Sequence, residues 1–467
     1  MAPNIRLTAE WVAAAMGGTI VRTGTHEEFS GVSIDTRTLR AGELYFGIRG
    51  DRFDGADFAA AATEAGASGV VVPRGRLTND VANVAVIEVE DTTAALQALA
   101  HATRKASGTK VVAITGSAGK TTTKEVTAEF LGAANRVIRN RGNLNNHIGL
   151  PLSLMELTAK PDIAVVELGM NHAGEISTLV RIAEPDVRVW TNVGEAHLGF
   201  FASIDAIADA KAEILEGADA GSLLVANADD DLVASRTTKF AGKVTTFGIE
   251  RNADVHADEI VDRGIDGTRA RVTTPRGTFD VSTPLVGRAN LSNILAATAV
   301  GLHFDVPLTN MAERAASLQP AHHRGDVVRL ARGVIVVDDS YNANPTATRR
   351  AIEVLRSTRT RGRRVAIIGE MLELGDRSTA LHEGVGRAAV AAGVDELVAV
   401  GGEPAKAMAD AAIADGMSRT HVRYFATSDQ AADAFDAYVH DGDLVLVKGS
   451  RGIRTDVVVD RLRAEFA

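Results

Sequence analysis

The sequence Thr-Gly-Ser-Ala-Gly-Lys-Thr-Thr at residues 115–122 contains the residue types that bind phosphate. An apolar run rich in β-branched residues, 111–114, precedes it and predicts a buried strand, and a helical pattern begins at Lys120. In such a strand–turn–helix unit, backbone N–H groups and the helix N-terminus face the phosphate. Lys120 would neutralise the phosphate charge, and the Thr121 hydroxyl can reach a bound Mg²⁺. We therefore predict a phosphate-binding loop.

The glycine spacing of this loop differs from the commonest phosphate-loop motif. Only two residues separate Gly116 from Gly119, whereas the common motif has four. A strand-to-helix turn that binds no ligand is the alternative. The Gly-Lys-Thr-Thr sequence directly after a buried strand favours the phosphate site.

Two neighbouring strands are expected to end in polar residues at the same edge of the sheet. The strand at 162–167 ends at Glu167, and the strand at 187–193 leads to His197. A carboxylate at the carboxyl end of a parallel strand, beside a phosphate loop, is well placed to bind Mg²⁺ directly or through water. The alternative for Glu167 is a solvent-exposed strand end with no ligand.

Lys211 falls on the apolar stripe of a predicted helix, seven residues after Ile204 and three before Ile214. A lysine that faces inward must be paired, deprotonated or chemically altered. Its amine can also reach the surface while its stem packs against apolar neighbours. Our hypothesis is that CO₂ carbamylates Lys211, which would replace a buried cation by an anion able to help hold a metal ion.

Two further groups of polar residues have regular spacing. Residues 31–37 alternate between apolar and polar, which predicts a strand with Ser33, Asp35 and Arg37 on one face. That face either binds a ligand or is an ordinary solvent face. Asn290 and Asn293 are three residues apart at the start of a predicted helix, so their side chains can point to the same side. Helix capping explains either asparagine equally well.

Composition limits the class of protein. The chain has 467 residues, a formal charge of -10, 45% hydrophobic residues and no cysteine. A negative charge argues against a general nucleic-acid binder, and a chain without cysteine forms no disulfide and no thiolate metal site. No apolar run approaches a membrane span, and the N-terminus lacks the pattern of a signal peptide. We therefore expect a cytoplasmic protein that neither inserts in a membrane nor binds nucleic acid.

The order of predicted elements indicates an α/β protein of three domains. We expect a small N-terminal α/β domain over residues 1–86 and a central P-loop-type ATP-binding sheet over 87–316. Within the second domain, residues 244–281 alternate and predict an antiparallel addition. Strands and helices alternate again over 317–467, which is typical of a doubly wound, Rossmann-like domain.

Taken together, these motifs resemble the Mur ligase family, the ATP-dependent amide-forming enzymes of bacterial peptidoglycan synthesis. The family-wide marks are Thr115 to Thr122, Glu167, His197, Lys211, Asn290, Asn293 and Arg324. A narrower resemblance is to the members that add D-alanyl-D-alanine to UDP-N-acetylmuramoyl-tripeptide. It rests on motifs at residues 33–37, 143–149, 167–171, 338–345, 369–375 and 447–451. The Asp-Asn-Pro-Arg signature of the preceding ligase is absent.

The resemblance implies ATP and Mg²⁺ as cofactors, and UDP-N-acetylmuramoyl-tripeptide and D-alanyl-D-alanine as substrates. The tripeptide carboxylate would attack the γ-phosphate of ATP, and the dipeptide amine would then capture the acyl phosphate, releasing ADP and phosphate. Substrates bound to three domains imply closure before chemistry, which keeps water from the acyl phosphate. We expect a monomer, and a tripeptide that ends in either diaminopimelate or lysine.

The resemblance also assigns roles to individual residues. The catalytic residues would be Lys120, Glu167, His197 and Lys211. Mg²⁺ would be held at one site by Thr121 and Glu167, and at a second by His197 and carbamylated Lys211. The ATP contacts would be Thr115, Gly116, Ser117, Ala118, Gly119, Lys120, Thr121, Thr122, Asn227, Asn290, Asn293, Arg324 and Asp339. The substrate contacts would be Ser33, Asp35, Arg37, Asn143, Asn145, Asn146, Tyr341, Asn342 and Asn344.

Three other functions fit parts of the pattern. The first is a sibling ligase with another acceptor, such as the preceding amino-acid-adding enzyme or a folylpolyglutamate synthase. The second is a nucleotide-binding regulatory or scaffold protein that has lost catalysis. The third is a generic P-loop ATPase or kinase, which the glycine spacing and the third α/β domain disfavour.

Overall fold

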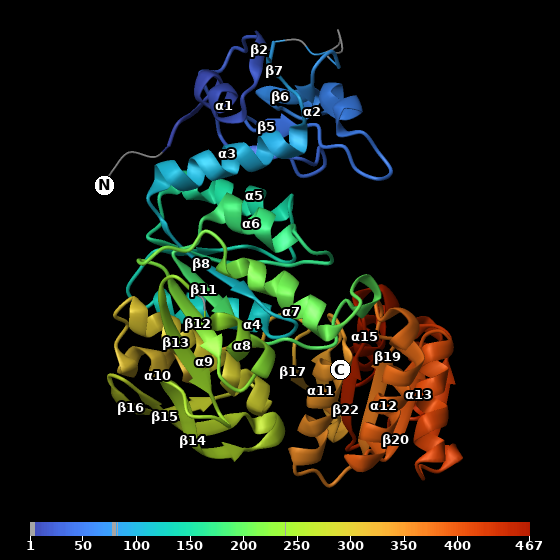
Figure 1. Ribbon diagram of the computed structural model, residues 1–467. Coiled ribbons are helices and arrows are strands. Elements are labelled where there is room, and N and C mark those ends of the chain that lie inside the picture. The colour runs from blue at the N-terminus through green and yellow to red at the C-terminus, as the bar shows by residue number, and fades with distance from the viewer. Residues whose placement is uncertain (1–4, 77–80, 82, 239) are drawn as a thin grey trace.

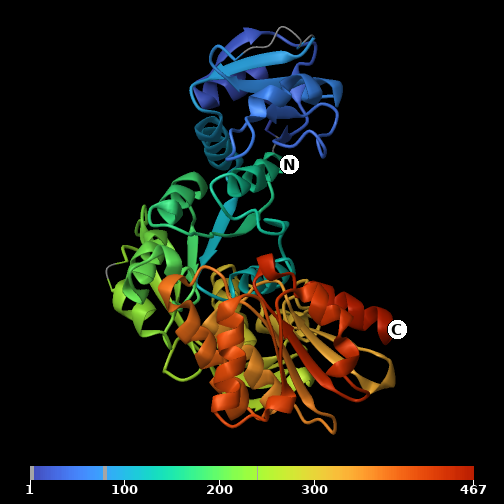
Figure 2. The same cartoon turned by 90° about the vertical axis from the view of Figure 1, so that its right-hand side faces the viewer.

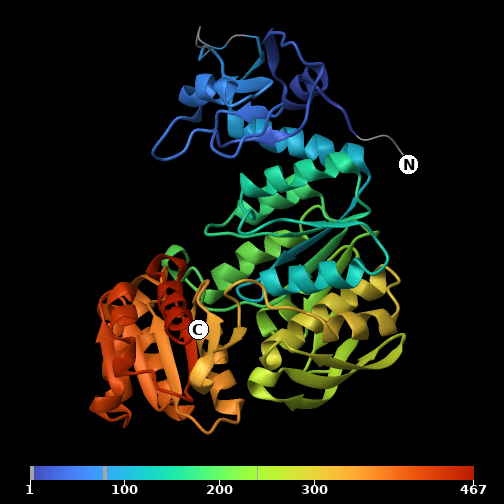
Figure 3. The same cartoon turned by 180° about the vertical axis from the view of Figure 1, so that it is seen from behind.

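The computed structural model describes residues 5–76, 81, 83–238 and 240–467. Figure 1 shows three α/β units, each built around its own sheet. The N-terminal unit lies at one end of the middle unit, and the C-terminal unit lies beside the middle unit; the view from behind in Figure 3 agrees. The expected three-domain α/β architecture is therefore confirmed.

The N-terminal unit contains a five-stranded sheet in which only β2 is antiparallel to its neighbour. In spatial order the strands are β2 (Thr19–Arg22), β7 (Ala85–Val89), β6 (Gly69–Pro73), β5 (Leu44–Phe46) and β4 (Val32–Ser33). A small second sheet pairs β1 (Leu7–Thr8) with β3 (Glu28–Phe29), and the helices are α1 (Ala9–Met16) and α2 (Ala59–Glu64). Thr8 caps α1, because its hydroxyl accepts a hydrogen bond from the Trp11 amide at 3.2 Å.

The strand that we expected over residues 31–37 is wrong, because β4 ends at Ser33. The Asp35 carboxylate accepts the Arg37 backbone N–H at 3.0 Å, and the Asp35 carbonyl accepts the Thr38 N–H at 3.2 Å. An aspartate that bonds to the backbone two residues further on forms a turn in place of a strand. Ser33, Asp35 and Arg37 therefore do not share a strand face.

The helix α3 (Thr92–Ser107) connects the first two units and packs against both. It contacts α1 on one side and, on the other, α5 (Gly149–Leu154) and α6 (Glu175–Ala183). Apolar residues of the two units form one continuous core around it, including Val12, Leu99 and Leu150. The domain boundary that we expected at residue 86 falls inside strand β7. We therefore propose that the first domain extends at least to Val89, where this strand ends.

The middle unit contains a nine-stranded sheet, parallel from β9 to β14 and antiparallel from β14 to β16. In spatial order the strands are β16 (Gly277–Thr283), β15 (Thr268–Thr274), β14 (Val255–Asp262), β13 (Lys243–Gly248), β12 (Leu223–Asn227), β11 (Val187–Trp190), β8 (Lys110–Thr115), β10 (Ile163–Glu167) and β9 (Val137–Arg139). The antiparallel addition is confirmed for β15 and β16, whereas β13 is parallel to both neighbours.

Helices cover both faces of the middle sheet. One face packs against α4 (Lys120–Leu131), α9 (Gly287–His303) and α10 (Leu308–Ala316). The other face packs against α3, α5, α6 and α7 (Ile204–Ala212), and α8 (Asp231–Thr237) contacts α7 and β12. Because both faces are covered, the central strands contain continuous apolar runs, Val111–Ile114 in β8 and Ile163–Val166 in β10.

The C-terminal unit is a doubly wound sheet, as the sequence predicted. In spatial order its strands are β17 (Asp326–Arg329), β18 (Ile335–Asp339), β22 (Leu444–Lys448), β19 (Arg364–Gly369), β20 (Glu396–Val400) and β21 (Val422–Phe425). Only the edge strand β17 is antiparallel. One face packs against α11 (Pro345–Ser357), α12 (Ser378–Ala391) and α13 (Glu403–Ala414), and the other against α14 (Ser428–Asp433) and α15 (Asp456–Glu465).

Within the described ranges, no helix is both long enough and apolar enough to cross a membrane.

Candidate active site

A cavity of about 1610 Å³ lies between the middle and C-terminal units and is lined by residues of both. The carboxyl ends of β8, β10, β11 and β12 open into it, because parallel strands present their carboxyl ends at one edge of the sheet. Most of the residues predicted from the sequence line this cavity. They are Ser117, Ala118, Gly119, Lys120, Thr121, Thr122, Asn143, Asn145, Asn146, Glu167, His197, Asn227, Asn290, Asn293, Arg324, Asp339, Tyr341, Asn342 and Asn344.

The phosphate-binding loop follows β8 and leads directly into α4, whose first residue is Lys120. Gly119 has φ +81°, and a Cβ atom there would lie 2.4 Å from Oδ1 of Asn293, so only glycine fits. Nζ of Lys120 donates a hydrogen bond to the Gly116 carbonyl at 2.9 Å and so lies across the loop. Burial lowers the pKa of Lys120; the Glu167 carboxylate opposes this effect and the Arg324 guanidinium adds to it.

The Glu167 carboxylate, at the end of β10, accepts two hydrogen bonds from neutral groups. Its Oε2 accepts the Thr121 hydroxyl at 2.7 Å, and its Oε1 accepts the Asn145 amide at 2.5 Å. The side chain is only 3% exposed, and no ion pair neutralises it among the described residues. A buried carboxylate beside a hydroxyl and an amide forms an oxygen-rich group of the kind that Mg²⁺ prefers. The exposed-strand-end alternative for Glu167 is therefore wrong.

His197 lines the same cavity and begins the short 3₁₀ helix Leu198–Phe200. Its Nδ1 lies 2.7 Å from Oε2 of Glu373, which belongs to the C-terminal unit. This hydrogen bond lowers the pKa of Glu373, although partial burial opposes the effect. His197 is therefore positioned by a residue from the opposite wall of the cavity.

Lys211 lies on α7 behind the cavity wall and is only 1% exposed. Within the described part of the chain its amine forms no hydrogen bond and no ion pair. Burial, and secondarily the charge of Lys120, holds the pKa of Lys211 well below its usual value. The alternative in which this amine reaches the surface is therefore wrong. Among the residues described, no group of three or more His, Asp or Glu could hold a metal ion by itself.

Asn290 and Asn293 point to the same side of α9 and hydrogen-bond to each other at 3.2 Å. Oδ1 of Asn293 also accepts the Thr123 hydroxyl at 3.2 Å, which connects α9 to α4. Helix α9 begins at Gly287, so neither asparagine is its N-cap residue. Asn227 lies at the end of β12. Its side-chain N–H donates a hydrogen bond to the Thr191 carbonyl, and its side-chain oxygen accepts one from the Asp229 amide.

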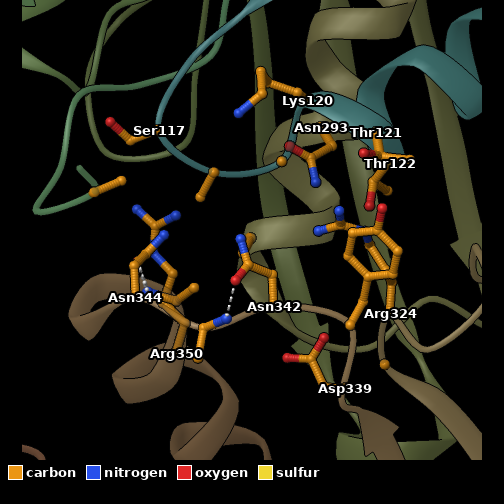
Figure 4. A pocket seen from close by; sticks show the side chains of 18 of the residues that line it. Ser117, Lys120, Thr121, Thr122, Asn293, Arg324, Asp339, Asn342, Asn344 and Arg350 are labelled. Carbon is orange, nitrogen blue, oxygen red and sulfur yellow. Dashed lines mark hydrogen bonds between the residues drawn. The ribbon is translucent and has the colours of Figure 1, made fainter. Parts of the chain in front are cut away.

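The C-terminal unit contributes cations and an aromatic ring to the opposite wall (Figure 4). The Arg324 guanidinium lies over the Tyr341 ring at 4.3 Å from its centroid. Nζ of Lys448 lies 2.6 Å from Asp339 and also donates to the Asn342 carbonyl. The Asn344 side chain caps α11 by accepting the Ala347 amide at 2.8 Å, so its oxygen already has a structural role.

Some predicted residues lie elsewhere. Thr115 is fully buried, and neither Thr115 nor Gly116 is among the residues that line the cavity. Ser33, Asp35 and Arg37 belong to the N-terminal unit, whose described residues do not line the cavity. Figure 2 shows that unit at the far end of the middle unit, away from the C-terminal unit.

The structure also brings to the cavity residues that we did not predict. Asn192 lines the cavity and accepts the Ala118 amide through its side chain at 2.9 Å. Asn140 is buried beside the cavity, where it accepts the Glu167 amide at 3.0 Å. Glu373 lies in the loop that follows β19, and Lys448 is the last residue of β22. A position at or after the carboxyl end of a strand is a signal that the sequence already offered. Arg350 lies inside α11, where the sequence pattern gives no signal for a ligand.

Three family models match the chain. Residues 28–104 match the model described as "Mur ligase family, catalytic domain", residues 114–301 match "Mur ligase middle domain", and residues 323–451 match "Mur ligase, glutamate ligase domain". Each match falls on one of the three structural units.

Individual proteins are similar over almost their whole length. A UDP-N-acetylmuramoyl-tripeptide–D-alanyl-D-alanine ligase from Bacillus subtilis is 33% identical over 98% of this chain and 98% of its own. A crystal structure of MurF from Acinetobacter baumannii has a TM-score of 0.89 and 32% identity, and the match covers 99% of this chain and all of that chain. The MurF ligase from Thermotoga maritima, solved in complex with ADP, has a TM-score of 0.81 and 29% identity over 93% of this chain and 97% of that chain.

Proposed function

The chain belongs to the Mur ligase family, and we propose that it joins D-alanyl-D-alanine to UDP-N-acetylmuramoyl-tripeptide with conversion of ATP to ADP and phosphate. The observation that carries this proposal is the single cavity in which Lys120, Glu167 and His197 meet the wall of the C-terminal unit. The full-length similarity to ligases of this name supports the choice of substrates. We place the reaction in the cytoplasm, in the synthesis of peptidoglycan precursors.

The first step activates a poor acyl donor. A carboxylate oxygen of the tripeptide attacks the γ-phosphorus of ATP, and the bond between this phosphorus and the bridging oxygen breaks to release ADP. The Lys120 ammonium and the loop amides stabilise the charge of the transferring phosphoryl group. Arg324, which lies close enough to Lys120 to affect its pKa, adds positive charge from the other domain.

The second step forms the amide. The amine of the dipeptide attacks the acyl phosphate carbon, phosphate leaves, and the nitrogen loses a proton. We propose that Tyr341 and Asn342, which line the C-terminal wall, face the reaction zone or the incoming dipeptide. Contacts between the two walls exclude water, which would otherwise hydrolyse the acyl phosphate.

Oxygen ligands for Mg²⁺ are present at the loop. The Thr121 hydroxyl and the Glu167 carboxylate fit this ion by chemical type and by burial. Bound there, Mg²⁺ would neutralise charge on the phosphoryl oxygens. We further propose that the neutral amine of Lys211 adds CO₂ and loses a proton, so that the resulting carbamate and His197 provide a second anionic group for a metal.

The decisive experiment measures ADP release with UDP-N-acetylmuramoyl-tripeptide and a series of acceptors. We expect release with D-alanyl-D-alanine and none above background with free amino acids or glutamate. Release with a free amino acid but not with the dipeptide would favour a sibling ligase. Tight ATP binding without turnover under any condition would favour a regulatory protein.

A further inference from the structure

Arg350 is a cation in the wall of the cavity. It lies on α11, two helical turns from the Asn344 cap, and its side chain lines the cavity. Among the described residues it forms no hydrogen bond and no ion pair. Its neighbour Arg349 is different, because it pairs with Glu195 of the middle unit.

The carboxylate that acts electrostatically on Arg350 is already occupied. The Arg350 residue is exposed to the cavity, but the protein atoms around its guanidinium lower its pKa by desolvation, and the charge of Asp230 only partly offsets this effect. Oδ1 of Asp230 accepts two amides at the start of α8, and Oδ2 accepts the Val193 amide at 2.8 Å. Asp230 is therefore a cap for α8, and the guanidinium is left with five N–H donors for a ligand.

Arg350 lies away from the ATP-binding end of the cavity. In Figure 4 it lies on the side of Asn344, whereas Arg324 lies on the side of Thr121 and Thr122. Arg324 is the guanidinium that affects the pKa of Lys120. The phosphate end of the cavity therefore already has two cations, Lys120 and Arg324. Arg350 is available to bind a different anion.

The second substrate of the proposed reaction carries an anion of suitable size. D-alanyl-D-alanine has a reacting amine at one end and a carboxylate at the other, about 7 Å away along two residues. Its carboxylate must lose water when the cavity closes, and this is costly without a charged partner. Arginine binds a carboxylate through two parallel N–H bonds, which fixes both its position and its orientation.

We propose that Arg350 binds the terminal carboxylate of the dipeptide acceptor, an inference that rests on the proposed ligase function. Anchoring this end directs the amine of the same molecule toward the acyl phosphate beside the phosphate-binding loop. Arg350 thereby selects acceptors that have a free carboxylate at the right distance from the amine.

The test compares Arg350→Met with the wild type in steady-state ADP release, using D-alanyl-D-alanine and D-alanyl-D-alaninamide as acceptors. We expect Arg350→Met to raise KM for the dipeptide roughly 10- to 100-fold, the range for loss of a charge-assisted bidentate contact. KM for ATP should not change. With the amide acceptor, which lacks the carboxylate, the wild type and the variant should have the same KM.

Two further variants make the result specific. Arg350→Lys should have an intermediate KM for the dipeptide, because an ammonium keeps the charge without the bidentate geometry. Arg356→Met, on the exposed side of the same helix, should behave as the wild type, since its side chain is 62% exposed and pairs only with Glu353.

Two outcomes would overturn the proposal. The first is a raised KM for ATP, or an equal loss of kcat with both acceptors, which would assign Arg350 to the phosphoryl group. The second is an unchanged KM for the dipeptide in Arg350→Met. Failure of the proposed function is distinguishable from both, because the wild type itself would then release no ADP in response to the dipeptide.

Discussion

Nδ1 of His197, in the middle unit, lies 2.7 Å from Oε2 of Glu373, in the C-terminal unit. The Glu373 carbonyl also accepts the Gly199 amide at 2.7 Å, so one residue fixes both ends of this short segment. The nearby pair between Arg349 and Glu195 adds a second link across the cavity. The position of His197 therefore depends on how the C-terminal unit docks.

Replacing Glu373 by Gln should lower kcat/KM by up to about tenfold. At a half-exposed site, a charge-assisted hydrogen bond is stronger than a neutral one by roughly 1.4 kcal/mol or less. Hydrogen exchange of the segment at 197–200 should become faster in the variant. The control is Glu383→Gln on α12, which removes only an exposed pair with Arg387. Unchanged kcat/KM and exchange in Glu373→Gln would show that His197 is held by other groups.

Lys211 should carry a carbamate when bicarbonate is present. Burial lowers the pKa of Lys211 and so favours the neutral amine, and only a neutral amine adds CO₂. With ¹³C-bicarbonate, NMR should detect a carbamate carbonyl in the wild type and not in Lys211→Met. Removal of CO₂ should lower the activity of the wild type, and bicarbonate should restore it. Lys406→Met, at an exposed position on α13, is the control. An inactive Lys211→Met variant together with no labelled carbonyl in the wild type would refute the carbamate.

Gly119→Ala should weaken ATP binding at least tenfold. The added Cβ would lie 2.4 Å from Asn293 Oδ1 at a residue with φ +81°, and both effects oppose the native loop. Such strain costs about 1–3 kcal/mol. The matched control is Gly384→Ala within α12, where a Cβ meets no atom within 4 Å; it should stabilise the helix by up to about 1 kcal/mol. Calorimetry with ATP and thermal unfolding measure the two effects, and equal ATP affinity in Gly119→Ala and the wild type would contradict the assignment of the loop.

His382 should make the loop that carries Glu373 less stable at acidic pH. This ring is fully buried; its Nε2 accepts the Met371 amide at 2.9 Å, and its Nδ1 bonds to the Ser378 carbonyl at 2.7 Å. Burial lowers the pKa of His382 below 6.5, although the Ser378 carbonyl and Glu370 oppose the effect. The folded state therefore binds fewer protons than the unfolded state just below pH 6.5, so stability falls as the pH falls through this range.

The measurement is hydrogen exchange of the peptide that contains Met371, corrected for intrinsic rates, between pH 7.5 and 5.5. Protection should be constant above pH 6.5 and should decrease below it in the wild type. His382→Gln, which has no titrating group at this position, should show no such decrease. A pH-independent protection in the wild type would mean that the ring does not control the loop.

Local sequence chemistry predicted the loop at 115–122 and the convergence of Glu167 with His197, because both follow buried parallel strands. The inward position of Lys211 was also predictable from helical periodicity. The turn at Asp35 was missed, because residues 31–37 alternate between apolar and polar as a strand would. The same residues allow the Asp35 side chain to bond to the Arg37 amide and form a turn. The motif at 369–375 pointed to the loop that carries Glu373, but not to its partner His197, which depends on how two domains dock. Arg350 could not be assigned, because nothing in the sequence shows which face of its helix turns toward the cavity.

The turn at residues 35–38 lies in a unit whose described residues do not line the reaction cavity. A ligand anchored at that turn and reacting beside Lys120 must bridge the separation with its own length. Each peptide residue spans roughly 3.5 Å when extended, so a precursor one residue too short would fall short of the phosphoryl group by that distance. A protein that anchored its substrate at that turn would therefore discriminate against incomplete precursors by reach, without needing a contact to each residue.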